Sequence, residues 1–453
     1  MVVSITSDSN VKKGPGRPIF SEKIRLEFLN NISCIDYIVI NNKPTAINII
    51  KELKPNVYCK GSDYKNHTKD ITGEIKNEIR ILRKFGGNIK YTNDITSSSS
   101  KLINEYYSNL TFNQKKNIKM IKNKKIDLSN LLEKSKKLKV LIIGELIVDQ
   151  YYFCETLGKS GKDPVLQMRE QNFETYLGGA AAIAGNVSKF CDNVTLLSMI
   201  GQDKKYLNII KKNLPKNIKV DLIFKKNSPT IIKKKYVDII TNSKVFGSYI
   251  INDSPLDTKN EKRLNKYLRN NISKFDLIIT SDYGHGFISD NNASLISRKA
   301  NFVALNAQIN AANRGYHTMN KYKNLDCVII NETELRHELR DKNSKVNFLM
   351  SNLSKNLNIK DLIVTQGSEG ATLYNKNLKK YFYMDAFASK VVDKIGSGDT
   401  MLSIISIFLK LAVDKTYSLL IGSLAASQSV GSMGNKALID KIKLIKAIDH
   451  TLK

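Results

Sequence analysis

Two glycines around a small residue, followed directly by an acid, form the stretch of this sequence best suited to chemistry. Residues 391–400 read Val-Val-Asp-Lys-Ile-Gly-Ser-Gly-Asp-Thr and lead into a long apolar run that predicts a helix. Gly396 and Gly398, with Ser397 between them, let the backbone approach a ligand closely. The free N–H groups of the following helix favour an anion there, most often phosphate. Asp399 is then either a helix cap or a general base that takes a proton from a hydroxyl attacking phosphorus.

The same segment resembles the signature of the ribokinase-like (PfkB-type) sugar kinases, Asp-Thr-x-Gly-Ala-Gly-Asp. This chain has Lys394 at the Thr position and Ser397 at the Ala position. The resemblance implies that Gly396, Ser397 and Gly398 form an anion hole and that Asp399 is the catalytic base.

Length and composition set the broad class of the protein. The 453 residues allow two or three domains, and 42% hydrophobic residues can fill real cores. A net charge of +30 raises the question of nucleic acid. However, lysines also fill the segments that look like ordinary enzyme, so we favour a compositional cause. The Gly-Pro-Gly-Arg-Pro stretch at 14–18 superficially resembles an AT-hook, but one copy is weak support, and we expect no nucleic-acid partner.

The cysteines and the apolar runs bear on location. Five cysteines, an odd number without a CxxC pair, suit a reducing cytoplasm. No apolar run reaches membrane-spanning length, and residues 1–10 do not read as a signal peptide, so we expect a cytoplasmic protein without a membrane partner.

Residues 1–107 alternate predicted strands and helices, which indicates a parallel α/β sheet. Their glycine- and cation-bearing loops, the 70–73 turn and the serine-rich helix start at 96–101 resemble the cytidylyltransferase-like nucleotidyltransferases that activate heptose 1-phosphate. That family opens with a strand–helix unit carrying a histidine pair. We expect this unit to be missing here, and the domain to be an inactive remnant as written. Its candidate ligand-binding residues are Arg17, Lys60, Gly61, Asp63, Ser98, Ser99 and Ser100.

The rest of the chain divides into a polar, lysine- and asparagine-rich linker at 108–136 and a second domain at 137–453. Strands near 140, 194, 277, 303, 328 and 362 alternate with helices. This pattern predicts an open, mostly parallel sheet with helices on both faces. Short strands at 150–176, 230–238 and 245–251 resemble the small β lid of the sugar kinases. The predicted fold class is therefore α/β, with two doubly wound parallel-sheet domains, a Rossmann-like nucleotidyltransferase fragment and a ribokinase-like domain with a β lid.

Several residues of the second domain match sugar-binding positions of the kinases. Asp149 would accept hydrogen bonds from sugar hydroxyls, although a turn or cap residue is the plainer interpretation. On composition alone the glycine pair at 178–179, which precedes a run of small residues that predicts a helix, favours close packing, whereas the resemblance favours a sugar site. Lid lysines could grip a substrate phosphate or could simply lie on a solvated strand face. The predicted substrate-binding residues are Asp149, Gly178, Gly179, Asn186, Lys233, Lys235 and Asp282.

Other motifs resemble the nucleotide site of these kinases. Asn331 and Glu334 form an Asn-x-x-Glu pair that can hold a hydrated Mg²⁺ next to phosphates, with Glu334 acting through water. Thr365, Gly367 and Gly370 match the nucleotide loop. Gly434 lies in a segment, 431–436, that the resemblance places near the adenine.

Four motifs in the right order cover residues 139–436 and predict an ATP-dependent carbohydrate kinase with ATP as co-substrate and Mg²⁺ as cofactor. The acceptor would be a sugar or sugar phosphate similar to heptose 7-phosphate, and the lid could form a homodimer. The whole chain resembles the bifunctional heptose 7-phosphate kinase/heptose 1-phosphate nucleotidyltransferases with the two halves in swapped order. Two alternatives remain: an ADP-heptose synthase-like nucleotidyltransferase that needs a further N-terminal segment, and a catalytically inactive binding protein with a kinase fold.

Overall fold

The computed structural model describes residues 1–11, 17–64, 74–92, 110–124, 126–202, 204–388 and 391–452. Its contacts divide the chain into two compact units, Met1–Ser129 with Asp440–Lys453, and Asn130–Ile439. The C-terminal residues thus group with the first unit, whereas the sequence placed them at the end of the second domain.

The first unit carries parallel strand pairs linked through helices, as its sequence pattern predicts. β1 (Val2–Thr6) pairs in parallel with β2 (Tyr37–Asn41), and β3 (Val57–Lys60) pairs in parallel with β4 (Asn88–Tyr91). The helical elements are η1 (Asp8–Asn10), α1 (Glu22–Asn30), α2 (Ile47–Leu53), η2 (Ser62–Tyr64), α3 (Glu74–Lys84), α5 (Phe112–Lys122) and α15 (Lys441–Thr451). α5 and most of α6 (Leu128–Lys137) fall within the predicted linker, whose described residues are therefore largely helical.

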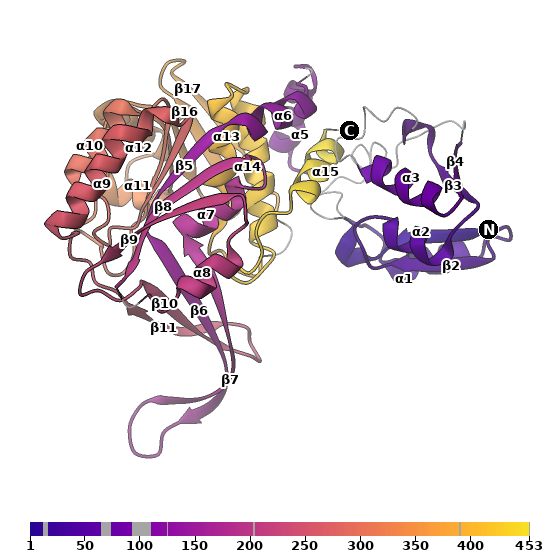
Figure 1. Cartoon of the computed structure of the whole chain (residues 1–453), viewed down its shortest axis with the longest axis horizontal. Coiled ribbons are helices and arrows are strands. Elements are labelled where there is room, and N and C mark those ends of the chain that lie inside the picture. Colours follow the sequence, from indigo (N-terminus) through magenta and orange to yellow (C-terminus); the bar gives the residue numbers. More distant parts are fainter. Residues whose placement is uncertain are drawn as a thin grey trace. The chain divides into compact units, whose positions relative to one another are not determined.

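The second unit is organised around a large sheet (Figure 1). In the described chain this sheet has nine strands in the order β17-β16-β15-β14-β13-β12-β5-β8-β9. Neighbouring strands from β9 to β15 run parallel, whereas β16 and β17 join the edge antiparallel. The strands are β5 (Lys139–Gly144), β8 (Asn193–Gly201), β9 (Ile218–Lys225), β12 (Leu277–Asp282), β13 (Val303–Ala307), β14 (Leu325–Asn331), β15 (Ile359–Thr365), β16 (Ala371–Asn375) and β17 (Lys380–Met384).

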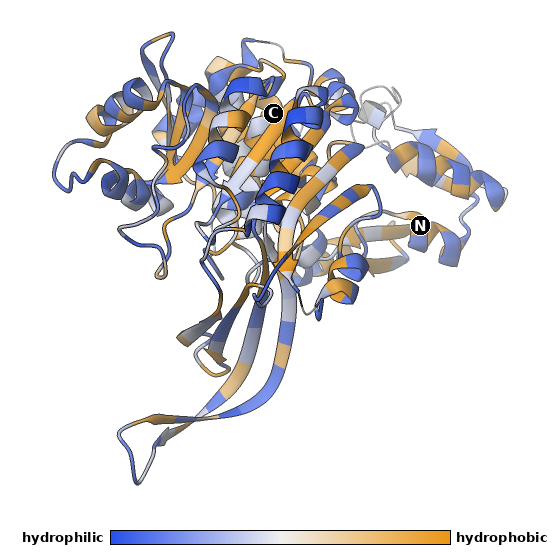
Figure 2. Ribbon diagram, turned by 60° about the vertical axis from the view of Figure 1, so that its left-hand side comes forward, coloured by the Kyte–Doolittle hydropathy of each residue, from blue (hydrophilic) through white to orange (hydrophobic). Residues whose placement is uncertain are grey.

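Helices cover both faces of this sheet, so its central strands must be apolar on both sides. Leu141, Ile142 and Ile143 of β5 are fully buried, and the central strands are correspondingly apolar in Figure 2. α7, α13 and α14 lie on one face, and α9 to α12 lie on the other (Figure 1). The helical elements are α7 (Ala180–Val187), α8 (Leu207–Asn213), α9 (Thr258–Asn271), η4 (Ile272–Lys274), α10 (Asp290–Lys299), α11 (Glu332–Leu339), α12 (Val346–Leu357), η5 (Gly367–Glu369), α13 (Ser397–Lys410) and α14 (Lys415–Ser429).

A separate four-stranded sheet, which we call the lid, projects from the large sheet (Figure 1). Its order is β11-β10-β6-β7, with β6 parallel to β10 and antiparallel to β7. Because side chains alternate along strands, the register assigns Asp149, Tyr151, Lys233 and Lys235 to one face and Tyr152, Lys234 and Tyr236 to the other. The lid strands are β6 (Leu146–Lys159), β7 (Leu166–Gly179), β10 (Ile232–Asp238) and β11 (Lys244–Ile250).

Candidate active site

The glycine turn before α13 has the backbone shape that its sequence predicts. Gly396 is the N-cap of α13 and has φ +82°, a left-handed conformation that favours glycine. A Cβ on Gly396 would lie 2.3 Å from Asn435 Oδ1, so space as well as conformation requires glycine. At Gly398, by contrast, an added Cβ meets no heavy atom within 4 Å. The turn therefore packs tightly on one side and leaves open space on the other.

Asp399 lies in the first turn of α13, where the helix dipole favours a negative charge. Its carboxylate is half-buried and accepts a hydrogen bond of 3.0 Å from the Tyr283 hydroxyl. Desolvation raises the pKa of Asp399 to about 6. The Tyr283 hydrogen bond and the Lys233 charge lower that pKa, and the Asp149 charge raises it. A carboxyl poised near neutral pH is suited to act as a general base.

Tyr283 follows β12, and both its backbone N–H and its backbone carbonyl form hydrogen bonds with side chains. Its N–H donates to Glu145 Oε2 at 2.9 Å, and its carbonyl accepts from the side-chain amides of Asn310 and Asn313 at 3.0 and 2.8 Å. Glu145 is fully buried, and burial raises its pKa to about 7. The asparagines belong to the segment that follows β13. That segment therefore positions the tyrosine that binds Asp399.

Asp149 lies on the inner face of the lid, close to residues predicted to join it. Its Oδ1 forms a 2.5 Å ion pair with Lys235, and Asn435 Nδ2 donates to its Oδ2 at 3.5 Å. A Cβ on Gly178 would lie 2.2 Å from Asp149 Oδ2, so any side chain at this position would force the carboxylate to move. Gly179 has φ +57° and caps α7. The structure thus brings Asp149, Gly178 and Lys235 together at one end of the site.

Lys233, on the same lid face as Asp149, has no carboxylate partner among the described residues. Only 9% of its surface is exposed, and its ammonium lies 5.3 Å from the Tyr283 ring centre and 5.4 Å from that of Tyr249. Desolvation lowers its pKa, while the charges of Asp149 and Asp399 raise it. No ion pair within 4.0 Å holds this ammonium among the described residues, in contrast to Lys235. It can therefore meet an anionic ligand beside Asp399.

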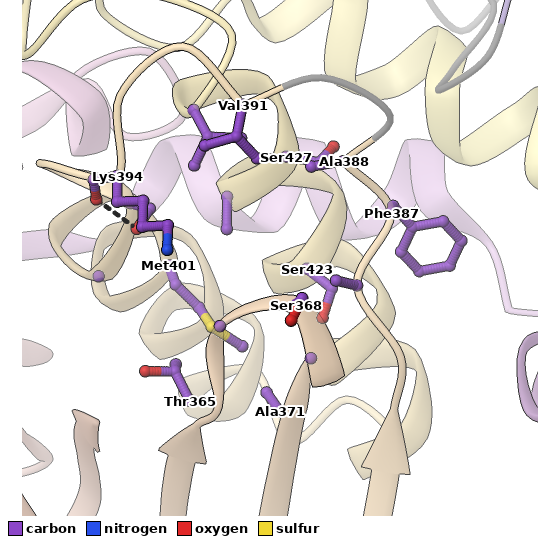
Figure 3. A pocket seen from close by; sticks show the side chains of 17 residues that line it. Thr365, Ser368, Ala371, Phe387, Ala388, Val391, Lys394, Met401, Ser423 and Ser427 are labelled. Carbon is purple, nitrogen blue, oxygen red and sulfur yellow. Dashed lines mark hydrogen bonds between the residues drawn. The ribbon is translucent and has the colours of Figure 1, made fainter. Parts of the chain in front are cut away.

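A cavity of about 280 Å³ lies on the other side of the glycine turn (Figure 3). The predicted nucleotide-loop residues Thr365, Gly367 and Gly370 line it together with Ser397 and Gly398. Side chains of Phe387, Met401 and Val430 supply apolar wall, and the lining also includes Ser368, Ala371, Ala386, Ala388, Val391, Lys394, Ser423, Ala426 and Ser427. The predicted nucleotide loop and the predicted anion hole thus share one cavity.

Asn331 and Glu334 occupy the N-terminus of α11 as a reciprocal capping box. The Glu334 N–H donates to Asn331 Oδ1, and the Asn331 N–H donates to Glu334 Oε2, both at 2.8 Å. The Ile309 N–H donates to the second Glu334 oxygen at 3.3 Å. Burial raises the pKa of Glu334 to about 7, and the charge of Asp399 adds to this. No cluster of three or more His, Cys, Asp or Glu side chains that could hold a metal occurs in the described chain. Each Glu334 oxygen keeps a lone pair beyond these hydrogen bonds, which suits a water-mediated contact with Mg²⁺.

Two predicted substrate residues are occupied by contacts within the protein. Asp282 is buried and holds the Lys321 ammonium at 2.7 Å and the Tyr322 hydroxyl at 2.8 Å. Asn186 donates to Thr400 Oγ1 at 3.3 Å and accepts from the Ile439 N–H at 3.0 Å. Both side chains therefore stabilise the walls of the site through protein contacts.

Sequence reasoning missed a network around Asp393, just before the glycine turn. Its carboxylate forms a 2.6 Å ion pair with Lys244 of β11 and accepts hydrogen bonds from the Tyr151 hydroxyl at 3.3 Å and the Gly434 N–H at 3.0 Å. Burial raises the pKa of Asp393, but the Lys244 hydrogen bond and charge and the N–H groups of Ile395 and Gly434 hold it below its ordinary value. Gly434 packs against Tyr151 and is not among the described residues that line the cavity. Asp393, an acid just before the glycine turn, could have been singled out from the sequence. Lys244 could not, because nothing in the sequence distinguishes it from the many other lysines.

The structure describes only some of the candidate ligand-binding residues of the first unit. Lys60 forms a 3.3 Å ion pair with Glu78 and lies over the rings of Tyr58 and Tyr64. Arg17 is half-buried, and desolvation lowers its pKa. Gly61 and the backbone of Asp63 lie at the end of β3. The predicted ligands Ser98, Ser99 and Ser100 and the 70–73 turn lie outside the described residues.

Each half of the chain matches a known protein family. A family model described as pfkB family carbohydrate kinase matches residues 137–442, and one described as cytidylyltransferase-like matches residues 1–105. The chain is 25% identical over 310 residues to the bifunctional protein HldE of Aliarcobacter butzleri, covering 66% of this chain and 62% of that protein. It is 26% identical over 318 residues to the same protein of Haemophilus influenzae (strain PittEE), covering 69% and 64%. The alignments thus span less than two-thirds of these relatives.

Solved structures resemble the second unit in fold. Phosphofructokinase-2 from Escherichia coli in complex with potassium aligns with a TM-score of 0.56 and 13% identity, covering 70% of this chain and 100% of that one. Arabidopsis thaliana ribokinase complexed with ribose and ATP aligns with a TM-score of 0.52 and 17% identity, covering 69% and 99%. The predicted ribokinase-like fold is confirmed. With its family model matched over residues 137–442, this chain belongs to the pfkB family of carbohydrate kinases.

Proposed function

We propose that this protein transfers the γ-phosphoryl group of ATP to a hydroxyl of a sugar or sugar phosphate. One observation carries the proposal: Asp399 lies at the glycine turn that also lines the cavity shared with the predicted nucleotide loop. An acceptor hydroxyl beside Asp399 would therefore face a phosphate in that cavity.

The chemistry follows from the residues around the turn. The Asp399 carboxylate takes the acceptor proton as the new oxygen–phosphorus bond forms, and the β-phosphate oxygen keeps the electrons of the bond that breaks. Tyr283 orients the carboxylate and keeps its pKa from rising further. The backbone N–H groups at the start of α13 stabilise charge that develops on the transferred phosphate. When bound, Mg²⁺ would neutralise part of the triphosphate charge, with Glu334 as its proposed water-mediated contact.

The acceptor is proposed to be a sugar phosphate similar to heptose 7-phosphate. Asp149 offers a carboxylate to sugar hydroxyls, with Lys235 and Gly178 fixing its place. Lys233 is buried and has no carboxylate partner within the described ranges, so it supplies a positive charge for a phosphate on the same molecule. The HldE relatives are bifunctional proteins, and the match of residues 1–105 to the cytidylyltransferase-like family supports a nucleotide-sugar context.

We also propose a homodimer through the outer face of the lid. Phe173, Tyr152, Tyr236 and Phe246 form a stacked row across all four strands, with ring centres 5.7, 4.9 and 4.2 Å apart. Phe173 is 58% exposed and Phe246 is 53% exposed, and every residue of the edge strand β11 is exposed. Exposed aromatic rows beside an open strand edge favour association with another sheet.

The cytoplasm is the proposed location, because Cys34 and Cys59 are free and exposed, a state that a reducing compartment preserves. No helix in the described ranges has the length and apolarity needed to cross a membrane.

The deciding experiment is ADP release from MgATP with a panel of sugars and sugar 7-phosphates. Wild type should turn over one class of acceptor, and Asp399→Asn should lose about 10²–10⁴-fold in kcat, the usual contribution of a general base. Asp221→Asn, which alters a carboxylate bound by Tyr267 at the outer helix α9, is the matched control. Sugar binding without turnover in wild type would instead favour a binding protein with a kinase fold.

A further inference from the structure

The cavity beside the glycine turn has a mostly uncharged lining with a single cation. Of the 17 residues that line it in the described part of the chain, Lys394 alone carries a charge. The others are small, hydroxyl-bearing or apolar, and the apolar wall includes Phe387, Met401 and Val430. A ligand with an apolar ring and a strongly anionic end would place the ring against this wall and the anionic end beside Lys394.

Lys394 is placed to meet that anionic end. Figure 3 shows its side chain extending into the cavity toward Met401. Its carbonyl oxygen accepts a 2.9 Å hydrogen bond from Ser397 Oγ, which ties the lysine backbone to the start of α13. Within the described ranges no carboxylate forms an ion pair with its ammonium. Lys235 and Lys244, by contrast, are neutralised by Asp149 and Asp393.

We infer that Lys394 binds the β- and γ-phosphates of the donor nucleotide and stays bound to the diphosphate after transfer. The inference rests on the proposed kinase function and adds a residue that the sugar-kinase signature does not supply, since threonine stands there. In the transfer step the acceptor oxygen bonds to the γ-phosphorus, the bond to the β-phosphate oxygen breaks, and its electron pair remains on ADP. The Lys394 ammonium beside that oxygen stabilises the negative charge that the oxygen gains.

Affinity for ADP and for adenosine separates this role from cavity shape, because adenosine has the ring but no phosphate. By titration calorimetry, Lys394→Met should weaken ADP binding by about tenfold or more, as expected for one charge-assisted hydrogen bond. Adenosine affinity should stay unchanged. Lys394→Arg should recover most of the ADP affinity, and Lys394→Thr should not. Lys355→Met, an exposed lysine on the outer helix α12, is the control.

The outcomes separate a failure of the phosphate-binding role of Lys394 from a failure of the proposed kinase function. Equal weakening of ADP and adenosine would overturn the phosphate role and show that Lys394 only shapes the cavity. Unchanged ADP affinity in Lys394→Met would overturn it as well. If wild type binds neither ADP nor adenosine, the proposed kinase function itself fails.

Discussion

The Tyr283 hydroxyl donates a 3.0 Å hydrogen bond to Asp399 Oδ1 across a sequence separation of 116 residues. β12 delivers the tyrosine from its carboxyl end, and α13 delivers the aspartate from its first turn. The Asp399 carboxylate is thus held by a tyrosine from the end of a parallel strand, and this hydrogen bond lowers its pKa.

The pH dependence of turnover should report the Asp399 pKa. A base must be deprotonated, so kcat/KM should fall as pH decreases through about 6, the value to which desolvation raises this pKa. A rate profile between pH 5 and 8 checks this. A profile that stays flat down to pH 5 would contradict the assigned role.

Tyr283→Phe should move that acidic limb to higher pH. In wild type the Tyr283 hydrogen bond favours the charged Asp399 carboxylate. Removing the hydroxyl should therefore raise the Asp399 pKa and lower activity most at pH 6. Tyr267→Phe removes an equivalent bond of 3.1 Å to Asp221 and should leave the profile in place. The same midpoint in all three proteins would show that Tyr283 does not tune the base.

The two glycines of the turn should respond differently to alanine. Gly396→Ala forces a side chain into a left-handed conformation and against Asn435, so it should cost about 1–3 kcal/mol in unfolding free energy. Gly398→Ala meets open space and should stay within about 0.5 kcal/mol of wild type. Its methyl group should nevertheless weaken ADP binding, because Gly398 lines the cavity. Denaturant titrations with parallel ADP titrations measure both effects, and unchanged ADP affinity in Gly398→Ala would exclude a phosphate at that turn.

Asp399→Asn should also change how stability depends on pH. Because its folded-state pKa is raised from the ordinary 3.8 to about 6, the folded protein binds this proton more tightly, and ionisation costs stability as pH rises from about 4 to 6. Asparagine does not ionise, so the Tm of the variant relative to wild type should be higher at pH 8 than at pH 4. Thermal unfolding at both values tests this, and a constant difference would contradict the raised pKa.

The proposed dimer should depend on the outer face of the lid. Phe246→Asp places a charge in the stacked row and should convert the protein to monomers by light scattering. Phe348→Asp changes an equally exposed phenylalanine on α12, outside the lid, and should have no such effect. A monomeric wild type would end the proposal.

The sequence predicted the elements better than the partners of individual side chains. Runs such as Val140–Ile143 are apolar throughout, which predicts strands buried on both faces, and the glycine turn before Asp399 has a purely local signal. The partners of Asp282 and Asn186 come from Lys321, Tyr322, Thr400 and Ile439, which are distant in sequence. Local patterns do not report such long-range contacts, so the sequence could not predict these partners, and substrate binding by Asp282 and Asn186 stays a prediction.

Asp393 and Lys394 are adjacent, yet the first holds Lys244 and Tyr151 of the lid and the second faces the cavity. A lid that swings away from the sheet must therefore either break the Asp393 contacts or pull on the peptide that carries Lys394. The Asp393 carboxylate thus links the lid to the segment that enters the glycine turn, and one pair of neighbouring residues serves both sides of the site.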